Sequence, residues 1–360
     1  MKAPDFARNL PVAALLLAGA ALATPAVAQY KLVSLAANEK DLGHNIPAAP
    51  NIDSRISNAW SLAWQAKGPF WVSDELTGYL TVYTPDGKSQ PTVVSVPNSA
   101  SDPLPPGSPA GLAANLYGGF SITQNGVSEP AEFIIATVDG TLQGWNPKVN
   151  KTSSVIALDN GTEPAAYTDL QIDQENGSAY LYAVNAYLNQ IEKYDSNWNL
   201  VKTFGDPNQM FGVYGLSVIQ GDIYVTFGPE FPGKPGAGGL DEFDTNGDLI
   251  KTLVSASANG PLNIPFAVVL APSNFGTYSN DLLVGNLQSG LIQAFDPSSG
   301  KFLGSVSDTK GKPIAVPGIW DMDFGGGDVK KNGKTDELYF VAGPDTYWGG
   351  MLGKIVPDIP

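Results

Sequence analysis

The sequence predicts an all-β protein built as a six-bladed β-propeller. Short apolar runs rich in Val, Ile, Tyr and Phe alternate with turn clusters such as "TPDG", "DTNG" and "DPSSG". No long stretch has the 3.6-residue apolar spacing of a helix. The chain contains 40 Gly and 29 Pro while charged residues make up only 15%, which is typical of many short strands joined by tight turns.

One strand–turn–strand pattern occurs six times. The copy "NDLLVGNLQSGLIQAFDPSSGKFLG", residues 280–304, contains a strand, a Gly-bounded turn, a second strand, a "DPSSG" turn and a third strand. The other copies begin at Phe70, Phe133, Leu181, Ile223 and Leu338. In each copy a large side chain ends the second strand, at intervals of 49 to 62 residues: Tyr83, Trp145, Tyr194, Phe243, Phe295 and Ile355.

Each copy also follows a further short strand. These upstream strands read "AWSLAW", "PAGLAA", "YTDLQI", "VYGLSV", "PFAVVL" and "IWDMDF". Units of four strands repeated at this spacing describe propeller blades. The last copy stops after "GKIVP" without a trailing strand, so we expect Tyr30–Ala37 to complete the last blade and close the ring. The propeller is then one domain, residues 29–360.

Residues 1–28 have the pattern of a secretory signal peptide. Lys2 and Arg8 precede an apolar run over residues 10–23, and "AVA" ends at Ala28. A run of this length is too short for the roughly 30 Å of bilayer hydrocarbon. We expect cleavage near Ala28, a periplasmic or extracellular location, and no membrane-spanning segment.

Charge and composition exclude several classes of function. A net charge of −15 repels phosphate backbones, so nucleic acid is not an expected partner. The absence of Cys excludes disulfides, thiol nucleophiles and Cys-based metal sites. With His44 as the single histidine, a zinc site with several His ligands is also excluded. We expect a monomer.

Three segments carry a resemblance to a known group of proteins. "NAWSLAW…GPFWVSD", "ATVDGTLQGWNP" and "DLLVGNLQSGLIQAFDPSSGKFLG" resemble exported bacterial conserved hypothetical proteins, and the match covers nearly the whole chain after residue 28. The resemblance implies a six-bladed propeller of the NHL-repeat or gluconolactonase-like kind and an exported location. It implies no catalytic residue.

The upstream strands supply the first group of candidate site residues, since the first strand of each blade lines the central channel. Trp60, Tyr214, Phe266 and Trp320 occupy equivalent positions there. They can form the aromatic wall of a ligand site or fill the space between blades. Asp169 and Asp321 lie in two of these apolar strands, where a carboxylate needs a partner or water, and they are candidate catalytic residues.

A second group lies at the end of each hairpin's first strand. It contains Asp74, Asp139, Asn185, Asn286 and Asp345. Such residues form turns, or their oxygens can hold Ca²⁺ or a similar divalent cation. The resemblance implies an acidic cation site of the gluconolactonase type without assigning ligands. We take Asp74, Asn185 and Asn286 as candidate metal ligands.

His44 and Arg55 lie in the long connection that precedes the first blade. If this connection crosses a face of the ring, both side chains approach the channel mouth. His44 is then the one side chain with an ordinary pKa suited to general-base catalysis near neutral pH.

These observations leave three functions open, and they leave open whether the protein is an enzyme. The first is an exported binding module that takes a protein, a glycan or a small molecule at one channel mouth. The second is a metal-dependent hydrolase or lactonase with Asp and Asn ligands, in which the cation polarises an ester and Asp321 acts as base. The third is a lyase that uses His44.

Overall fold

The computed structural model describes residues 29–102, 104–163, 165–206, 211–229, 237–257, 259–344 and 348–358. The predicted signal peptide, residues 1–28, and Asp345 lie outside these described residues. Within them every regular element is a β-strand, so no helix there is long and apolar enough to cross a membrane.

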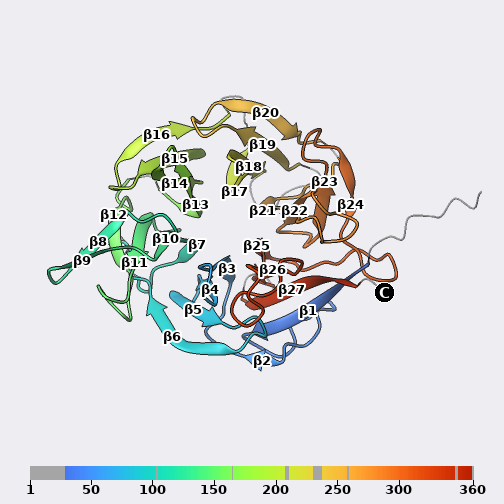
Figure 1. Ribbon diagram of the computed structural model, residues 1–360, viewed down its shortest axis with the longest axis horizontal. Coiled ribbons are helices and arrows are strands. Elements are labelled where there is room, and N and C mark those ends of the chain that lie inside the picture. The colour runs from blue at the N-terminus through green and yellow to red at the C-terminus, as the bar shows by residue number, and fades with distance from the viewer. Residues whose placement is uncertain are drawn as a thin grey trace, which may run out of the picture.

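Six sheets stand around a central axis, as Figure 1 shows. This arrangement confirms the predicted six-bladed β-propeller. The first strand of each blade is the innermost one, and the six inner strands, β3, β7, β13, β17, β21 and β25, contact one another in order around the axis. These strands therefore line the channel, as the repeat predicted.

The strands of the first three blades follow the predicted units. Blade 1 contains β3 (Ala59–Ala63), β4 (Phe70–Asp74), β5 (Tyr79–Tyr83) and β6 (Ser89–Ser95). Blade 2 contains β7 (Pro109–Ala114), β10 (Phe133–Thr137), β11 (Thr141–Trp145) and β12 (Val155–Asp159). Blade 3 contains β13 (Tyr167–Glu175), β14 (Ser178–Asn185), β15 (Gln190–Asp195) and β16 (Leu200–Phe204).

The next two blades have the same four-stranded order. Blade 4 contains β17 (Gly212–Ile219), β18 (Asp222–Gly228), β19 (Gly239–Phe243) and β20 (Leu249–Val254). Blade 5 contains β21 (Pro265–Leu270), β22 (Leu282–Asn286), β23 (Ile292–Phe295) and β24 (Phe302–Ser305). An extra hairpin of β8 (Ser121–Gln124) and β9 (Val127–Pro130), which the repeat did not predict, projects from blade 2 (Figure 1).

Blade 6 combines strands from both ends of the chain. It contains β25 (Ile319–Phe324), β26 (Leu338–Ala342), β27 (Met351–Asp358), β1 (Gln29–Ala37) and the short parallel strand β2 (Asn51–Ile52). β1 pairs antiparallel with β27, from Gln29 opposite Asp358 to Ala37 opposite Met351. The buried Tyr30 hydroxyl also donates to the Phe275 carbonyl oxygen at 3.0 Å, which ties β1 to blade 5.

The six large residues that define the repeat occupy one structural position. Each pairs with a residue at or near the start of the second strand of its blade, and all six side chains are buried. The pairs are Phe70–Tyr83, Phe133–Trp145, Leu181–Tyr194, Ile223–Phe243, Leu282–Phe295 and Leu338–Ile355. The buried clusters join adjacent blades, so burial between sheets holds the ring together.

A β-bulge recurs in the innermost strand pair of every blade. The register shifts near the start of each inner strand, for example between Ala59 and Ser61 and between Ile319 and Asp321. The other four blades show the same irregularity. A bulge leaves a residue unpaired and redirects its side chain. The residues at these bulges include Trp60, Thr168, Tyr214, Phe266 and Trp320.

Candidate functional site

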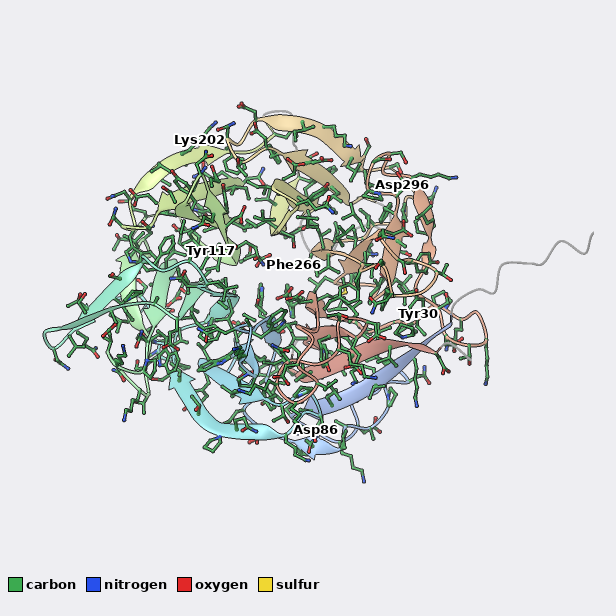
Figure 2. All side chains as sticks on the ribbon, viewed as in Figure 1. Tyr30, Asp86, Tyr117, Lys202, Phe266 and Asp296 are labelled. Atoms are coloured by element: carbon green, nitrogen blue, oxygen red, sulfur yellow. The ribbon has the colours of Figure 1, made fainter. Side chains whose placement is uncertain are left out.

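The four predicted aromatic residues meet one another in the channel. The Trp60 and Trp320 rings stack with centroids 3.8 Å apart, and Phe266 packs edge-on against Trp320 at 5.0 Å. Tyr214 stacks on Phe266 at 6.1 Å. Figure 2 shows Phe266 next to the ring centre. Because the bulges turn these side chains toward the axis, they pack on each other instead of filling wedges between blades. We call these four residues the aromatic cluster.

Hydrogen bonds fix the aromatic cluster. The Trp60 indole N–H donates to the Thr168 carbonyl oxygen at 2.9 Å, which links blade 1 to blade 3. The Trp320 indole N–H donates to Asn58 Oδ1 at 2.7 Å. Trp60, Phe266 and Trp320 are all buried. The cluster therefore lies in the channel near the first residues of the inner strands.

Asp169 and Asp321 join neighbouring inner strands in the same way on opposite sides of the ring. Asp321 Oδ2 accepts the Leu62 N–H at 3.0 Å and the Ser61 hydroxyl at 2.7 Å, which joins blade 6 to blade 1. Asp169 Oδ2 accepts the Leu216 N–H at 2.9 Å, which joins blade 3 to blade 4. In both residues Oδ1 accepts the N–H of the next residue. These bonds supply the partners that a carboxylate in an apolar strand requires.

The structure adds Asp323, which the sequence reasoning missed. Asp323 lies two residues after Asp321 on β25, so both side chains project from the same face of the strand. Its Oδ1 accepts the Phe324 N–H at 2.7 Å. The sequence "IWDMDF" contained a signal for this residue. Because side chains two residues apart in a strand lie on the same face, a channel-facing Asp321 implies a channel-facing Asp323.

Burial and mutual repulsion shift the titration of this acidic group. Desolvation raises the pKa of Asp321 to about 6, although hydrogen bonds to Asp321, above all from the Leu62 N–H, partly oppose this increase. Desolvation and then the Asp321 charge raise the pKa of Asp323 to about 7. Desolvation and the Asp321 charge also raise the pKa of Asp169 well above its usual value. None of the ion pairs between described residues includes any of these carboxylates.

A cavity of about 590 Å³ opens at the other end of the inner strands. Its lining comes from five of them, including Leu62, Gln171, Ser217, Val268 and Asp323. A neighbouring cavity of about 190 Å³ shares Leu62, Gln171 and Asp323 and reaches β7. We call the larger cavity the mouth cavity. It lies beyond the aromatic cluster along the axis, with Asp321 and Asp323 in its wall.

Trp64 forms part of both cavities and follows β3 directly. Its indole nitrogen is buried and makes no hydrogen bond of acceptable geometry. The N–H lies near the Asp323 carboxylate and opposes the increase in the Asp323 pKa that burial causes. Asn332 holds the adjoining loop by donating to the Gln65 and Ala66 carbonyl oxygens, both at 3.3 Å.

The candidate metal ligands are engaged within their own blades. Asp74 is fully buried and accepts the Thr81 hydroxyl at 2.6 Å, and burial raises its pKa well above the usual value. Asn185 donates to Glu192 Oε1 at 2.8 Å, and Asn286 Oδ1 accepts the Asn263 N–H at 2.6 Å. Asn185 also forms part of its hairpin turn, because its Oδ1 accepts the Leu188 N–H at 3.2 Å. Asp74 Oδ1, in contrast, is buried and has no hydrogen-bond partner among the described residues.

Among the described residues no group of three or more His, Asp or Glu side chains could hold a metal ion. Asp139, the remaining described member of this column, accepts the Ser99 N–H at 2.6 Å. The calcium site stays a prediction.

His44 lies away from the channel, contrary to the expected approach to its mouth. It is exposed and lines a separate cavity of about 510 Å³ with Tyr30, Lys31 and Leu32 of β1. The reason is the parallel pairing of β2 with β1, which keeps the connection beside the outer strand of blade 6. Arg55 is occupied by Asp53, with its Nη2 atom 2.6 Å from Asp53 Oδ2.

Sequence comparisons give relatives without an assigned activity. No family model matches the chain. An uncharacterised protein of Acanthamoeba polyphaga mimivirus is 27% identical over 355 residues, covering 92% of this chain and 87% of that protein. A second one is 25% identical over 355 residues, covering 92% and 82%. These relatives are viral, so they do not support the resemblance to exported bacterial proteins.

Comparison with solved structures finds two lyases whose folds are similar to that of this chain. Streptogramin B lyase is similar with a TM-score of 0.54 at 11% identity, covering 92% of this chain and 98% of the lyase. A catalytically inactive virginiamycin B lyase from Staphylococcus aureus, in a structure with quinupristin, is similar with a TM-score of 0.51 at 12% identity, covering 86% and 83%. At this identity the similarity shows the fold alone.

Proposed function

We propose that this protein is a binding module that holds a small molecule in the mouth cavity. The observation that carries the proposal is the cavity of about 590 Å³, built from the ends of inner strands and lined mainly by apolar side chains with a few polar groups. Small-molecule sites have this size and this composition. The aromatic cluster lies along the axis beyond the cavity.

Rigid strands position the lining of this cavity. Ser217 of β17 donates its hydroxyl to the Val268 carbonyl oxygen of β21 at 2.6 Å, and Asp321 of β25 binds the backbone of β3. Bonds of this kind between neighbouring blades keep the wall preformed, which lowers the entropy cost of binding. Export of the protein and its monomeric state remain parts of this proposal.

The test is a crystallographic fragment screen, followed by titration of the strongest binder. We expect fragments to occupy the mouth cavity. Gln171→Trp, which adds bulk to a residue that lines both cavities, should abolish binding. Thr203→Trp, at an exposed position on the outer strand β16, is the matched control and should bind normally. Fragments found only outside the mouth, or equal binding by both variants, would overturn the proposal.

A lyase is the second candidate function, because the two similar propellers above are lyases. His44 would then act in its own cavity beside β1 and not in the channel. Once a substrate is known, activity that survives in His44→Ala removes this candidate. The calcium-dependent hydrolase is tested by thermal melting with and without chelator, and the binding proposal expects the same melting temperature in both.

A further inference from the structure

We propose that the mouth cavity selects a small organic ammonium compound, an amine or quaternary amine with an apolar body. This inference rests on the proposed binding function and names the class of ligand. It follows from the charges of the lining, from its apolar walls, from the acceptor capacity of Asp323 and from the aromatic ring of Trp64.

The charged side chains that line the mouth cavity are acidic. Among the described residues that line the mouth cavity, Asp321 and Asp323 are the only charged ones, and those of the neighbouring small cavity include no basic residue. Two other cavities of similar size both contain lysines, for example Lys31 in one and Lys88 in the other. A ligand cation would therefore meet carboxylates in the mouth cavity without competition from a protein cation.

The two carboxylates have different capacities for a ligand. Asp321 already accepts three hydrogen bonds, from Ser61, Leu62 and Met322, so its main role is to join two blades. Among the described residues Asp323 accepts one backbone hydrogen bond, from the Phe324 N–H, and lies near the Trp64 indole N–H. Burial and the nearby Asp321 charge both disfavour the ionised form of Asp323 and raise its pKa. A bound cation favours the ionised form and opposes both effects. Asp323 is thus the ligand's counter-ion, and Asp321 is a positioning residue.

The rest of the wall favours an organic cation over an inorganic one. Most of the remaining lining is apolar, including Val268, Leu270 and Phe324, whereas Ca²⁺ requires six to eight oxygen ligands. The half-buried Trp64 offers an aromatic ring, which attracts ammonium groups. Its indole N–H lies near the Asp323 carboxylate, so the ring and the carboxylate are next to each other in the wall. An apolar body with one ammonium group uses all of these features.

The experiment is isothermal titration calorimetry with four probes: benzyltrimethylammonium chloride, benzyl alcohol, sodium phenylacetate and calcium chloride. We expect the ammonium probe to bind about tenfold more tightly than benzyl alcohol, equivalent to about 1.4 kcal/mol. Phenylacetate should bind most weakly of the aromatic probes. Calcium should not compete with the ammonium probe.

Three variants test which residues bind the ammonium group. Asp323→Asn keeps the acceptor for the Phe324 N–H and should lower ammonium affinity about tenfold without changing benzyl alcohol affinity. Trp64→Leu should also weaken the ammonium probe more than benzyl alcohol. Glu39→Gln removes the same charge from an exposed position on the β1–β2 connection and should change nothing, which controls for net charge.

The outcomes separate this inference from the proposed function. Benzyl alcohol or phenylacetate binding as tightly as the ammonium probe, or an unchanged affinity in Asp323→Asn, overturns the ammonium assignment. If fragments still occupy the mouth, the binding function stands. Calcium that displaces the ammonium probe would assign the site to an inorganic cation. If no probe binds and fragments avoid the mouth, both proposals fall.

Discussion

Replacing Asp323 by Asn should make the protein more stable at alkaline pH. The folded state raises the pKa of this carboxyl from 3.8 to about 7. A raised carboxyl pKa means that the folded state favours the protonated form. The resulting stabilisation is complete below about pH 4 and is lost as the pH rises through about 7. Asn resembles the protonated form at every pH.

The magnitude follows from the two pKa values. Their difference corresponds to about 4 kcal/mol at about 1.36 kcal/mol for each pH unit. This is an upper limit, because Asp323 is half-buried and shares its repulsion with Asp321. We expect a gain of about 1 to 4 kcal/mol at pH 8. In a chain of this size that equals roughly 2 °C in melting temperature for each kcal/mol.

The assay is urea denaturation of the wild type and of Asp323→Asn at pH 8 and at pH 4. The variant should have a higher free energy of unfolding than the wild type at pH 8. At pH 4 the two values should be nearly equal, because the Asp323 carboxyl of the folded wild type is protonated there. Titration of Asp169 is common to both proteins and largely cancels in the difference, whereas the repulsion between Asp321 and Asp323 is lost in the variant and forms part of the gain. A variant that is less stable at pH 8, or a gain that is equal at both pH values, would refute the reasoning.

Three further predictions test the fold. Gly290→Ala should cost about 2 kcal/mol or more, since Gly290 has a φ of 68° and an added Cβ would lie 2.3 Å from the Pro317 nitrogen; Gly126→Ala, with a φ of 80° and open space around it, should cost about half as much in the same denaturation assay. Trp320→Ala should cost about 3 to 5 kcal/mol through lost stacking, and a loss below 1 kcal/mol by urea denaturation would contradict a packed aromatic cluster. Lys193→Met should cost about 1 to 3 kcal/mol by leaving Glu175 without the ammonium group 2.7 Å away, and adding Glu175→Gln should restore part of that loss.

The repeat made the architecture predictable, because each blade uses the same buried residue at the same register. Phe295 and its five counterparts defined the unit in the sequence and occupy one position in the structure. The hairpin β8–β9 was not predicted, since an insertion has no counterpart in the other blades.

The candidate site was predictable in part. The positions of Asp169 and Asp321 in the channel followed from the upstream strands, but the bulges did not, because a bulge changes pairing without leaving a pattern of residue types. The sequence therefore placed the four aromatic residues in the channel but did not predict that they pack on one another. His44 was misplaced for a related reason, since two residues of β2 pairing with β1 determine the path of its connection.

The pairing of β1 with β27 has a consequence for the order in which the protein can fold during synthesis. β1 is made before all other described strands, yet its partner β27 lies more than 300 residues later in the chain. At 5 to 20 residues per second a ribosome needs roughly 15 to 60 s to cover that distance. Blades 1 to 5 can form while translation continues, whereas β1 presents an unpaired edge throughout this time. The sixth blade is the last to assemble, and a chain that terminates before Met351 leaves the first strand without its partner.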